Sequence, residues 1–260
     1  MNIELKQYLD DKTILLDVLD TYPRHIKKLI ADNMPLLNQY FDEEQSLYEK
    51  HLQMNYFPTY NGNKYYEAYN SLVDKIVNDL SENCYYALSF HATRLLNEEI
   101  ADIKTNGFKL FNKNEHSKKL DLLYAYGFNK SEIDILKNFS YVENGQRSNK
   151  VYFCHAISTL NFDNGLNPFF STWGGEITYW HKDIPSSILN RLKCIGFPCL
   201  VIAKLPIFQI TSASYMIKSL LHNFITKSQK EDIDTSLTTN DIVILDVIPF
   251  DKFAGDKVLI

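Results

Sequence analysis

Ser89-Phe90-His91-Ala92-Thr93-Arg94 is the stretch around which the chain is organised, and it closes an apolar run, Cys84-Tyr85-Tyr86-Ala87-Leu88, that predicts a buried strand. The pattern from Leu95 to Ile103 is helical, and Asn106-Gly107 is expected to end that helix. The strand would therefore deliver a histidine, a hydroxyl and an arginine to a point just before a helix. Because strand ends commonly present polar groups to ligands, we expect one wall of a binding pocket here. The ordinary alternative is a core histidine, a helix-capping threonine and a surface arginine, and the spacing alone favours it.

The composition limits the classes of protein to consider. A length of 260 residues suits one large domain, or a catalytic domain with a modest extension. A net charge of −5 provides no general basic field for non-specific nucleic-acid binding, although net charge does not describe local patches. With 17 Tyr and 16 Phe, the chain can fill a core and still leave rings for stacking on flat ligands.

The cysteines and histidines do not predict a metal site. Cys84, Cys154, Cys194 and Cys199 form no CxxC pair, and we expect them to be buried thiols in a reducing compartment. The seven histidines are never paired at metal-ligand spacing. The N-terminus does not have the pattern of a signal peptide, and no apolar run is long enough to span a membrane, so we expect a cytoplasmic protein. The chain also lacks GxGxxG, Walker and GxSxG motifs.

The hydrophobic pattern changes near residue 83. Residues 1–82 are predicted to form a helical N-terminal region, and residues 83–260 a catalytic domain in which short apolar runs alternate with helical patterns. The predicted strands of the second region are 84–90, 107–111, 150–155, 176–180, 198–205 and 241–248. Its predicted helices are 95–104, 115–126, 130–138, 185–194 and 213–227. The fold class is therefore α+β.

A second stretch, Val151-Tyr152-Phe153, predicts a strand whose valine and phenylalanine are buried. Tyr152 would then point to the opposite face, toward a groove, where its ring could stack on a planar base or nicotinamide. A packed sheet tyrosine is the commoner outcome for such a pattern.

The most unusual stretch is Trp173-Gly174-Gly175-Glu176, which is followed by Tyr179 and Trp180. Paired glycines allow a sharp bend or a close approach of backbone to a ligand. A carboxylate surrounded by rings can steady a developing positive charge, so Glu176 is our candidate catalytic acid. The alternative is a plain Gly-Gly turn with a solvated Glu176. Asp241 and Asp246 bracket a later strand, and Asp246 is expected to form a turn.

Taken together, these stretches resemble an ADP-ribosyltransferase domain over about residues 84–250. That family begins with a strand ending in a His-x-Thr or His-Gly-Thr motif, as at His91-Ala92-Thr93, followed by a helix and a glycine, as at Gly107. A Val/Ile-Tyr-Phe strand follows, which Val151-Tyr152-Phe153 matches. The His-Ala-Thr-Arg and Trp-Gly-Gly-Glu pair is also similar to uncharacterised bacterial proteins assigned to that superfamily.

The resemblance implies two split, strongly bent sheets with flanking helices that hold NAD as co-substrate. It implies that His91 binds a ribose with support from Thr93, and that Tyr152 or Tyr179 stacks on nicotinamide. Trp173, Gly174 and Gly175 would complete the cofactor site, and Arg94 would meet the pyrophosphate or belong to the surface. The family's usual glutamate begins a late strand, where this chain has Asp241. This departure leaves the acid between Glu176, our choice, and Asp241.

The implied activity is transfer of ADP-ribose from NAD to a macromolecular acceptor, either a nucleic acid such as RNA or a protein. Such transferases are often toxins of toxin–antitoxin or phage-defence systems, and the helical N-terminal region could bind an antitoxin, position a substrate or complete the fold. One alternative is an enzyme that hydrolyses NAD or transfers phosphate onto its ribose. Another is a non-catalytic module that binds a nucleotide or peptide.

Overall fold

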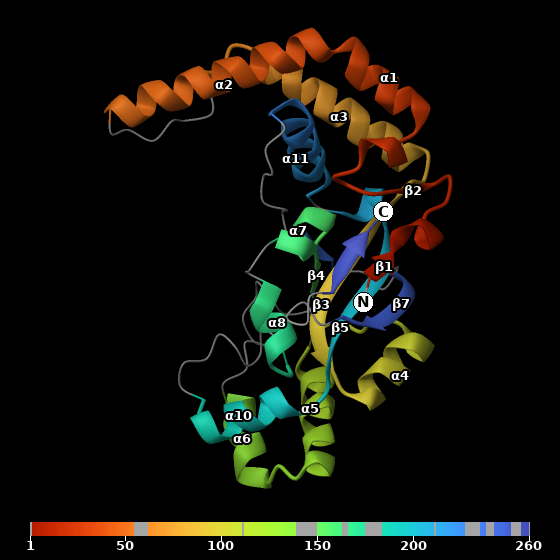
Figure 1. The fold of residues 1–260 in the computed structure, drawn as a ribbon, viewed down its shortest axis with the longest axis vertical. Helices are drawn as coiled ribbons and strands as arrows, with labels where there is room; N and C mark the ends of the chain where they lie inside the picture. Colours follow the sequence, from red (N-terminus) through yellow and green to blue (C-terminus); the bar gives the residue numbers. More distant parts are fainter. Residues whose placement is uncertain are drawn as a thin grey trace.

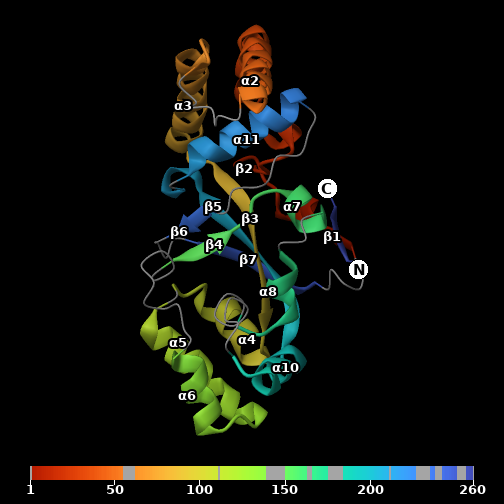
Figure 2. The ribbon, with the colours of Figure 1, turned by 90° about the vertical axis from the view of Figure 1, so that its left-hand side faces the viewer.

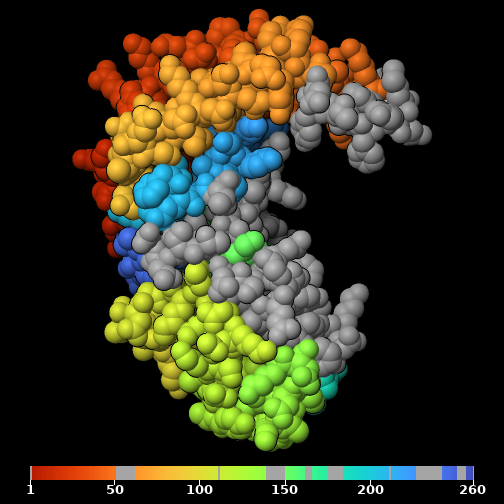
Figure 3. Space-filling view, turned by 180° about the vertical axis from the view of Figure 1, so that it is seen from behind, coloured from red at the N-terminus to blue at the C-terminus, as the bar shows by residue number. Residues whose placement is uncertain are grey.

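The computed structural model describes residues 2–54, 62–110, 112–138, 150–162, 166–174, 184–210, 212–226, 235–237, 242–250 and 256–259. These residues form an elongated body with helices at both ends and strands between them (Figure 1). Figure 3 shows the same order from behind, with α2 and α3 at one end and α5 with α6 at the other. The protein thus mixes helices and strands, as predicted from the alternation after residue 83.

The central sheet has the strand order β2-β3-β5-β7. Its two long strands, β3 (Tyr86–Leu95) and β5 (Phe197–Pro206), are antiparallel and pair over their full length. Strand β7 (Val243–Pro249) is antiparallel to β5, and the short β2 (Thr13–Ile14) is parallel to β3. Strands β3 and β5 are buried along most of their length because both faces of the sheet are covered, and β5 is apolar almost throughout.

Two small sheets adjoin this centre. Strand β1 (Asn2–Glu4) pairs in parallel with β8 (Lys257–Leu259), which joins the two ends of the chain. Strand β4 (Val151–Phe153) pairs antiparallel with β6 (Thr235–Leu237) and lies beside β3 (Figure 2). An antiparallel bridge between Phe90 and Cys154 connects β4 to β3.

The helices at the upper end of Figure 1 pack against the end of the central sheet where β3 begins and β5 ends. Helices α1 (Arg24–Asp32), α2 (Met34–Met54), α3 (Tyr66–Glu82) and α11 (Ala213–Thr226) share one hydrophobic core with β3 and β5. In that core the rings of Tyr40 and Tyr69 stack with centroids 3.8 Å apart. Short 3-10 helices η1 (Leu5–Tyr8), η2 (Leu19–Thr21) and η7 (Ile207–Gln209) connect these parts.

The lower helices form a second core beyond the end of β3. They are α5 (Lys113–Leu122), η4 (Leu123–Tyr126), α6 (Lys130–Asn138) and α10 (Ser186–Cys194). Helix α4 (Asn97–Asn106) instead packs against β5 and β7 in a separate cluster. Two short helices, α7 (Ile157–Phe162) and α8 (Asn167–Ser171), lie beside the central sheet, α7 next to β8 and α8 against β3 and β5 (Figure 1). Asn129 caps α6: its side chain accepts from the Glu132 amide at 3.1 Å, and the Glu132 side chain accepts from the Asn129 amide at 2.8 Å.

The strand that carries His91 is longer than predicted. We expected it to stop at Phe90 and to present His91, Thr93 and Arg94 at its end, but β3 continues to Leu95 because β5 pairs with it along its whole length. The polar side chains therefore lie within a buried strand. The following helix begins at Asn97, two residues later than predicted, and ends at Asn106, as expected, with Gly107 at φ 77°.

Three further expectations were wrong. The first 82 residues are not wholly helical, because residues 2–4 and 13–14 are strands that pair with strands beyond residue 83. Residues 107–110 form no strand, and residue 111 lies outside the described residues. Cys84 and Cys194 are exposed, whereas Cys154 and Cys199 are buried, and all four thiols are free.

The N-terminal residues are also tied to the middle of the chain. The Asp17 carboxylate accepts the backbone N–H groups of Ile157 and Ser158 at 3.2 and 3.0 Å, which caps the start of α7. Residues before and after position 82 therefore share contacts and a core, and the predicted boundary does not separate two cores. No helix in the described part of the chain is both long and apolar enough to cross a membrane.

Gly196, just before β5, is predicted to tolerate no side chain. Its φ is +66°, and a Cβ there would lie 2.6 Å from the Leu95 carbonyl oxygen. Gly127 is the matched control, because its φ is +79° but the nearest atom to its Cβ would be a terminal nitrogen of the Arg191 side chain at 3.6 Å, an ordinary contact distance. Gly127→Ala should cost about 1–2 kcal/mol of unfolding free energy in urea denaturation. Gly196→Ala should cost clearly more, and equal losses would contradict the backbone clash.

Candidate functional site

The ring of His91 is partly exposed and is held by a defined hydrogen bond. It lies in the middle of β3, and its Nδ1 donates to the Tyr152 carbonyl oxygen at 2.8 Å. The proton is therefore on Nδ1, and the neutral ring presents Nε2 as a hydrogen-bond acceptor.

The surroundings of His91 keep it neutral. Burial lowers the pKa of His91 to about 4, the hydrogen bond to Tyr152 acts in the opposite direction, and the positive charge of Lys119 lowers the pKa further. At neutral pH the imidazole is thus uncharged. Such a group suits a neutral hydroxyl donor better than an anion.

Two aromatic rings flank His91, and the sequence did not assign either of them to the site. The Phe108 ring lies edge-on with its centroid 4.9 Å away, and the Phe153 ring is tilted at 5.7 Å. Phe108 follows Gly107 directly, where the chain leaves α4, and no periodicity marks it. Phe153 was expected in the core, and it is buried there.

Strand alternation separates the predicted ligand contacts onto two faces. Thr93 shares the face of His91, two residues along β3, and is buried. The Phe90–Cys154 bridge sets Phe153 opposite His91 and Tyr152 opposite Ala92. Tyr152 is partly exposed between two buried neighbours, as predicted, but it contributes its carbonyl rather than its ring to His91.

Arg94 lies on the face of β3 opposite to His91 and Thr93, and it joins two segments of the chain. Its Nε donates to the Ile195 carbonyl at 2.7 Å, and one of its terminal nitrogens donates to the Phe170 carbonyl at 3.2 Å. The expected pyrophosphate contact thus competes with these bonds to the protein backbone.

Trp173 is packed in the lower core and not displayed to a ligand. Its side chain is 1% exposed, and its indole N–H donates to Glu99 at 2.6 Å. Glu99 is itself buried and also accepts from the Leu96 amide at 2.9 Å and from Lys119 at 3.1 Å. A buried carboxylate needs such donors, and this need explains why the indole turns inward.

This network connects the neighbourhood of Trp173 to that of His91. Lys119 binds Glu99, which binds Trp173, and the charge of the same lysine acts on His91. Gly174 has a φ of 89°, so the bend predicted at the glycine pair begins there. Gly175, Glu176, Tyr179 and Asp241 lie outside the described residues.

Asp246 does not form a turn but lies inside β7 at a register shift. It accepts from the Tyr8 hydroxyl at 3.0 Å and pairs with Lys104 at 3.4 Å. Burial, together with Asp246, raises the pKa of Tyr8 to about 12. Asp246 therefore links the N-terminal segment to β7.

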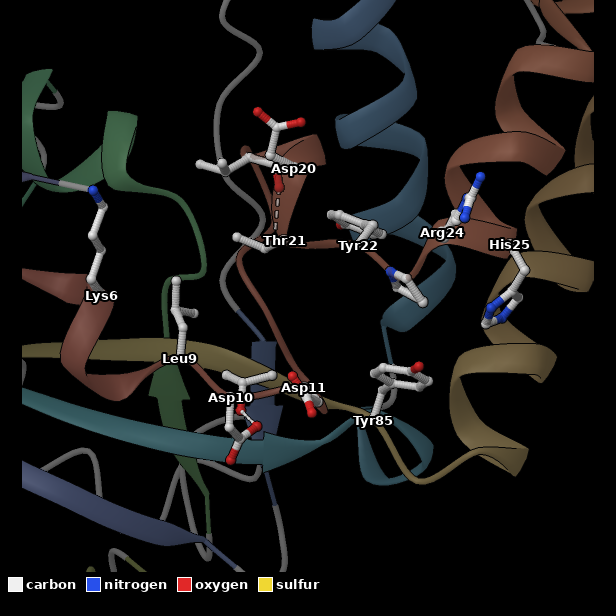
Figure 4. A pocket seen from close by; sticks show the side chains of 13 residues that line it. Lys6, Leu9, Asp10, Asp11, Asp20, Thr21, Tyr22, Arg24, His25 and Tyr85 are labelled. Carbon is white, nitrogen blue, oxygen red and sulfur yellow. Dashed lines mark hydrogen bonds between the residues drawn. The ribbon is translucent and has the colours of Figure 1, made fainter.

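A separate cleft of about 750 Å³ lies by the N-terminal segment, away from His91. Its lining mixes charges: Asp10, Asp11 and Asp20 lie between Lys6 on one side and Arg24 on the other (Figure 4). Asp10 is already paired with Lys204 at 2.5 Å, which holds the pKa of that carboxyl at about 2. Because acidic and basic side chains both line the cleft, its charge does not favour one class of ligand.

Comparison with models of known protein families, with curated proteins and with solved structures found no match for this chain. Among the described residues, no group of three or more His, Cys, Asp and Glu side chains is arranged to hold a metal ion. The interpretation of the site therefore depends on the chemistry around His91.

Buried histidines are predicted to make the fold sensitive to acid. Burial lowers the pKa of His116 to about 4 and that of His155 to about 3, against an ordinary value near 6.5. The unfolded chain then takes up protons first. The unfolding free energy should thus fall from pH 6.5 toward pH 4, by about 1.4 kcal/mol per pH unit for each such histidine.

In urea denaturation at pH 7, 6 and 5, His116→Leu should reduce the pH dependence of the unfolding free energy by the contribution of one histidine. Leu136→Ala, a cavity in the same lower core, is the control: it should lower stability at every pH and leave the slope unchanged. An unchanged slope in His116→Leu would contradict the depressed pKa.

Proposed function

We propose that the protein is an NAD-dependent ADP-ribosyltransferase that transfers ADP-ribose to a macromolecular acceptor, either RNA or protein. The observation that carries this proposal is the neutral His91, whose Nδ1 is bound to the Tyr152 carbonyl and whose Nε2 is left as an acceptor. A ribose hydroxyl is a neutral donor of the kind that this nitrogen can accept.

The groups beside His91 suit the rest of a dinucleotide. Thr93 supplies a hydroxyl on the same face of β3, and Phe108 and Phe153 supply apolar rings. Apolar walls with a few fixed polar groups are typical of small-molecule sites. Lys119 pairs with Glu99, but its side chain is 39% exposed and its charge acts on His91, whereas Arg94 binds two backbone carbonyls; Lys119 is therefore the better candidate for a pyrophosphate contact.

In the proposed reaction the bond between nicotinamide and ribose breaks, and nicotinamide leaves with the bonding electron pair. The ribose carbon becomes oxocarbenium-like, and a nearby carboxylate stabilises its positive charge. The acceptor's nucleophile then bonds to that carbon and loses its proton. We assign the carboxylate to Glu176, because Trp173, three residues earlier, is anchored through Glu99 and Lys119 to the surroundings of His91.

Labelled NAD incubated with the protein and a cell lysate tests this proposal. Digestion with protease or nuclease then shows which macromolecule carries the label. Glu176→Gln should lower transfer on the order of 10²–10³-fold, because the stabilising charge is lost. Asp134→Asn, an exposed carboxyl on α6, is the matched control and should keep full transfer.

The outcomes separate the candidate activities. Nicotinamide release without a labelled product would indicate NAD hydrolysis instead of transfer. Absence of both release and label with any lysate would leave only a binding module. Undiminished transfer by Glu176→Gln would reject Glu176 as the acid and direct the test to Asp241→Asn.

A further inference from the structure

Strand β4 meets β3 at a single backbone bridge. The Phe90 amide donates to the Cys154 carbonyl at 2.8 Å, and the Cys154 amide donates to the Phe90 carbonyl at 2.9 Å. Each residue of β3 that flanks Phe90 adds a side-chain bond to the β4 segment. His91 binds the Tyr152 carbonyl, and Ser89 Oγ lies 2.6 Å from His155 Nδ1.

The Ser89–His155 pair is completely buried, with both residues at 0% exposure. Ser89 Oγ is also 3.2 Å from the Ala87 carbonyl oxygen. The two contacts are compatible when Ser89 donates to Ala87 and His155 Nδ1 donates to Ser89. Burial lowers the pKa of His155 to about 3, so this ring is neutral.

We propose that Ser89 and His155 are positioning residues, which hold β4 in the register that brings the Tyr152 carbonyl to His91. Their bond acts together with the Phe90–Cys154 bridge, the His91 bond and the pairing with β6 to fix a strand of three residues. A displacement of β4 along its axis by one residue, about 3.3 Å, would replace the carbonyl that orients His91. His91 would then lose its fixed Nδ1 proton.

This inference rests on the proposed function only for its consequence, because ribose binding needs Nε2 of His91 as an acceptor. The positioning itself is a property of the protein without NAD. A packing role alone predicts lost stability, whereas positioning predicts a changed His91. The two roles therefore give different results.

The test is ¹⁵N NMR of the histidine rings in the full-length protein without NAD, with His91 assigned from the spectrum of His91→Gln. In the wild type, Nδ1 of His91 should carry the proton and the pKa should be about 4. In Ser89→Ala the proton should redistribute to Nε2, and the His91 pKa should fall further, because the hydrogen bond to Tyr152 that raises it is lost. Ser89→Cys, which nearly conserves volume, should give the same shift if Ser89→Ala does not fold.

Two variants complete the design. His155→Asn places an amide where Nδ1 was, so His91 should titrate as in the wild type. The amide of His155→Gln cannot occupy that position, so the titration of His91 should shift. Leu136→Ala lowers stability from the lower core and should leave His91 unchanged. Identical His91 titration and protonation in Ser89→Ala, Ser89→Cys and the wild type would overturn the inference.

Label transfer from NAD then separates this inference from the proposed function. If the wild type transfers no label but Ser89→Ala still shifts His91, the positioning stands and the proposed function fails. If the wild type transfers label, the variants that shift His91 should lose transfer together. Full label transfer by a variant whose His91 titration is shifted would show that transfer does not depend on the Ser89–His155 pair.

Discussion

The central constraint on this structure is that β3 carries four polar side chains through a sheet covered on both faces. Ser89, His91, Thr93 and Arg94 all lie in a strand that pairs with β5 along its full length. Polar groups in such a place must find partners, because an unpaired buried group costs about 1–3 kcal/mol. Ser89 finds His155, His91 finds the Tyr152 carbonyl, and Arg94 finds the carbonyls of Ile195 and Phe170.

Each of these bonds fixes a different segment against β3. The β4 segment is held on the edge of the strand, and α8 and the turn before β5 are held near its end. The alternation of the strand then decides what each residue can do. His91 and Thr93 share one face with two phenylalanine rings, whereas Arg94 bonds to backbone on the other. The same stretch thus serves both architecture and the candidate site.

The sequence predicted the elements that have strong local signals. Helices at 130–138 and 213–226 and the strands at 151–153 and 243–249 were visible in periodicity, and Gly107 marked the end of α4. The limits of the strands were not visible in the sequence, because β3 extends to Leu95 only through its pairing with β5. The strands at 2–4 and 13–14 depend on partners far along the chain and have no local signal.

The sequence predicted which residue types belong to the candidate site, but not which way their side chains point. His91 was found from its motif, yet its neighbours Phe108 and Lys119 come from other elements. Trp173 was expected beside a ligand, but the buried carboxylate of Glu99 turns its indole inward. Such a reversal depends on a contact between residues 74 positions apart, which no spacing rule describes.

The most direct measurement is a crystal structure of the protein with a non-cleavable NAD analogue. The account predicts a ribose hydroxyl within about 2.6–3.2 Å of His91 Nε2, while Nδ1 stays bound to the Tyr152 carbonyl. An analogue bound elsewhere, or one that leaves Nε2 without a ribose contact, would contradict the central claim.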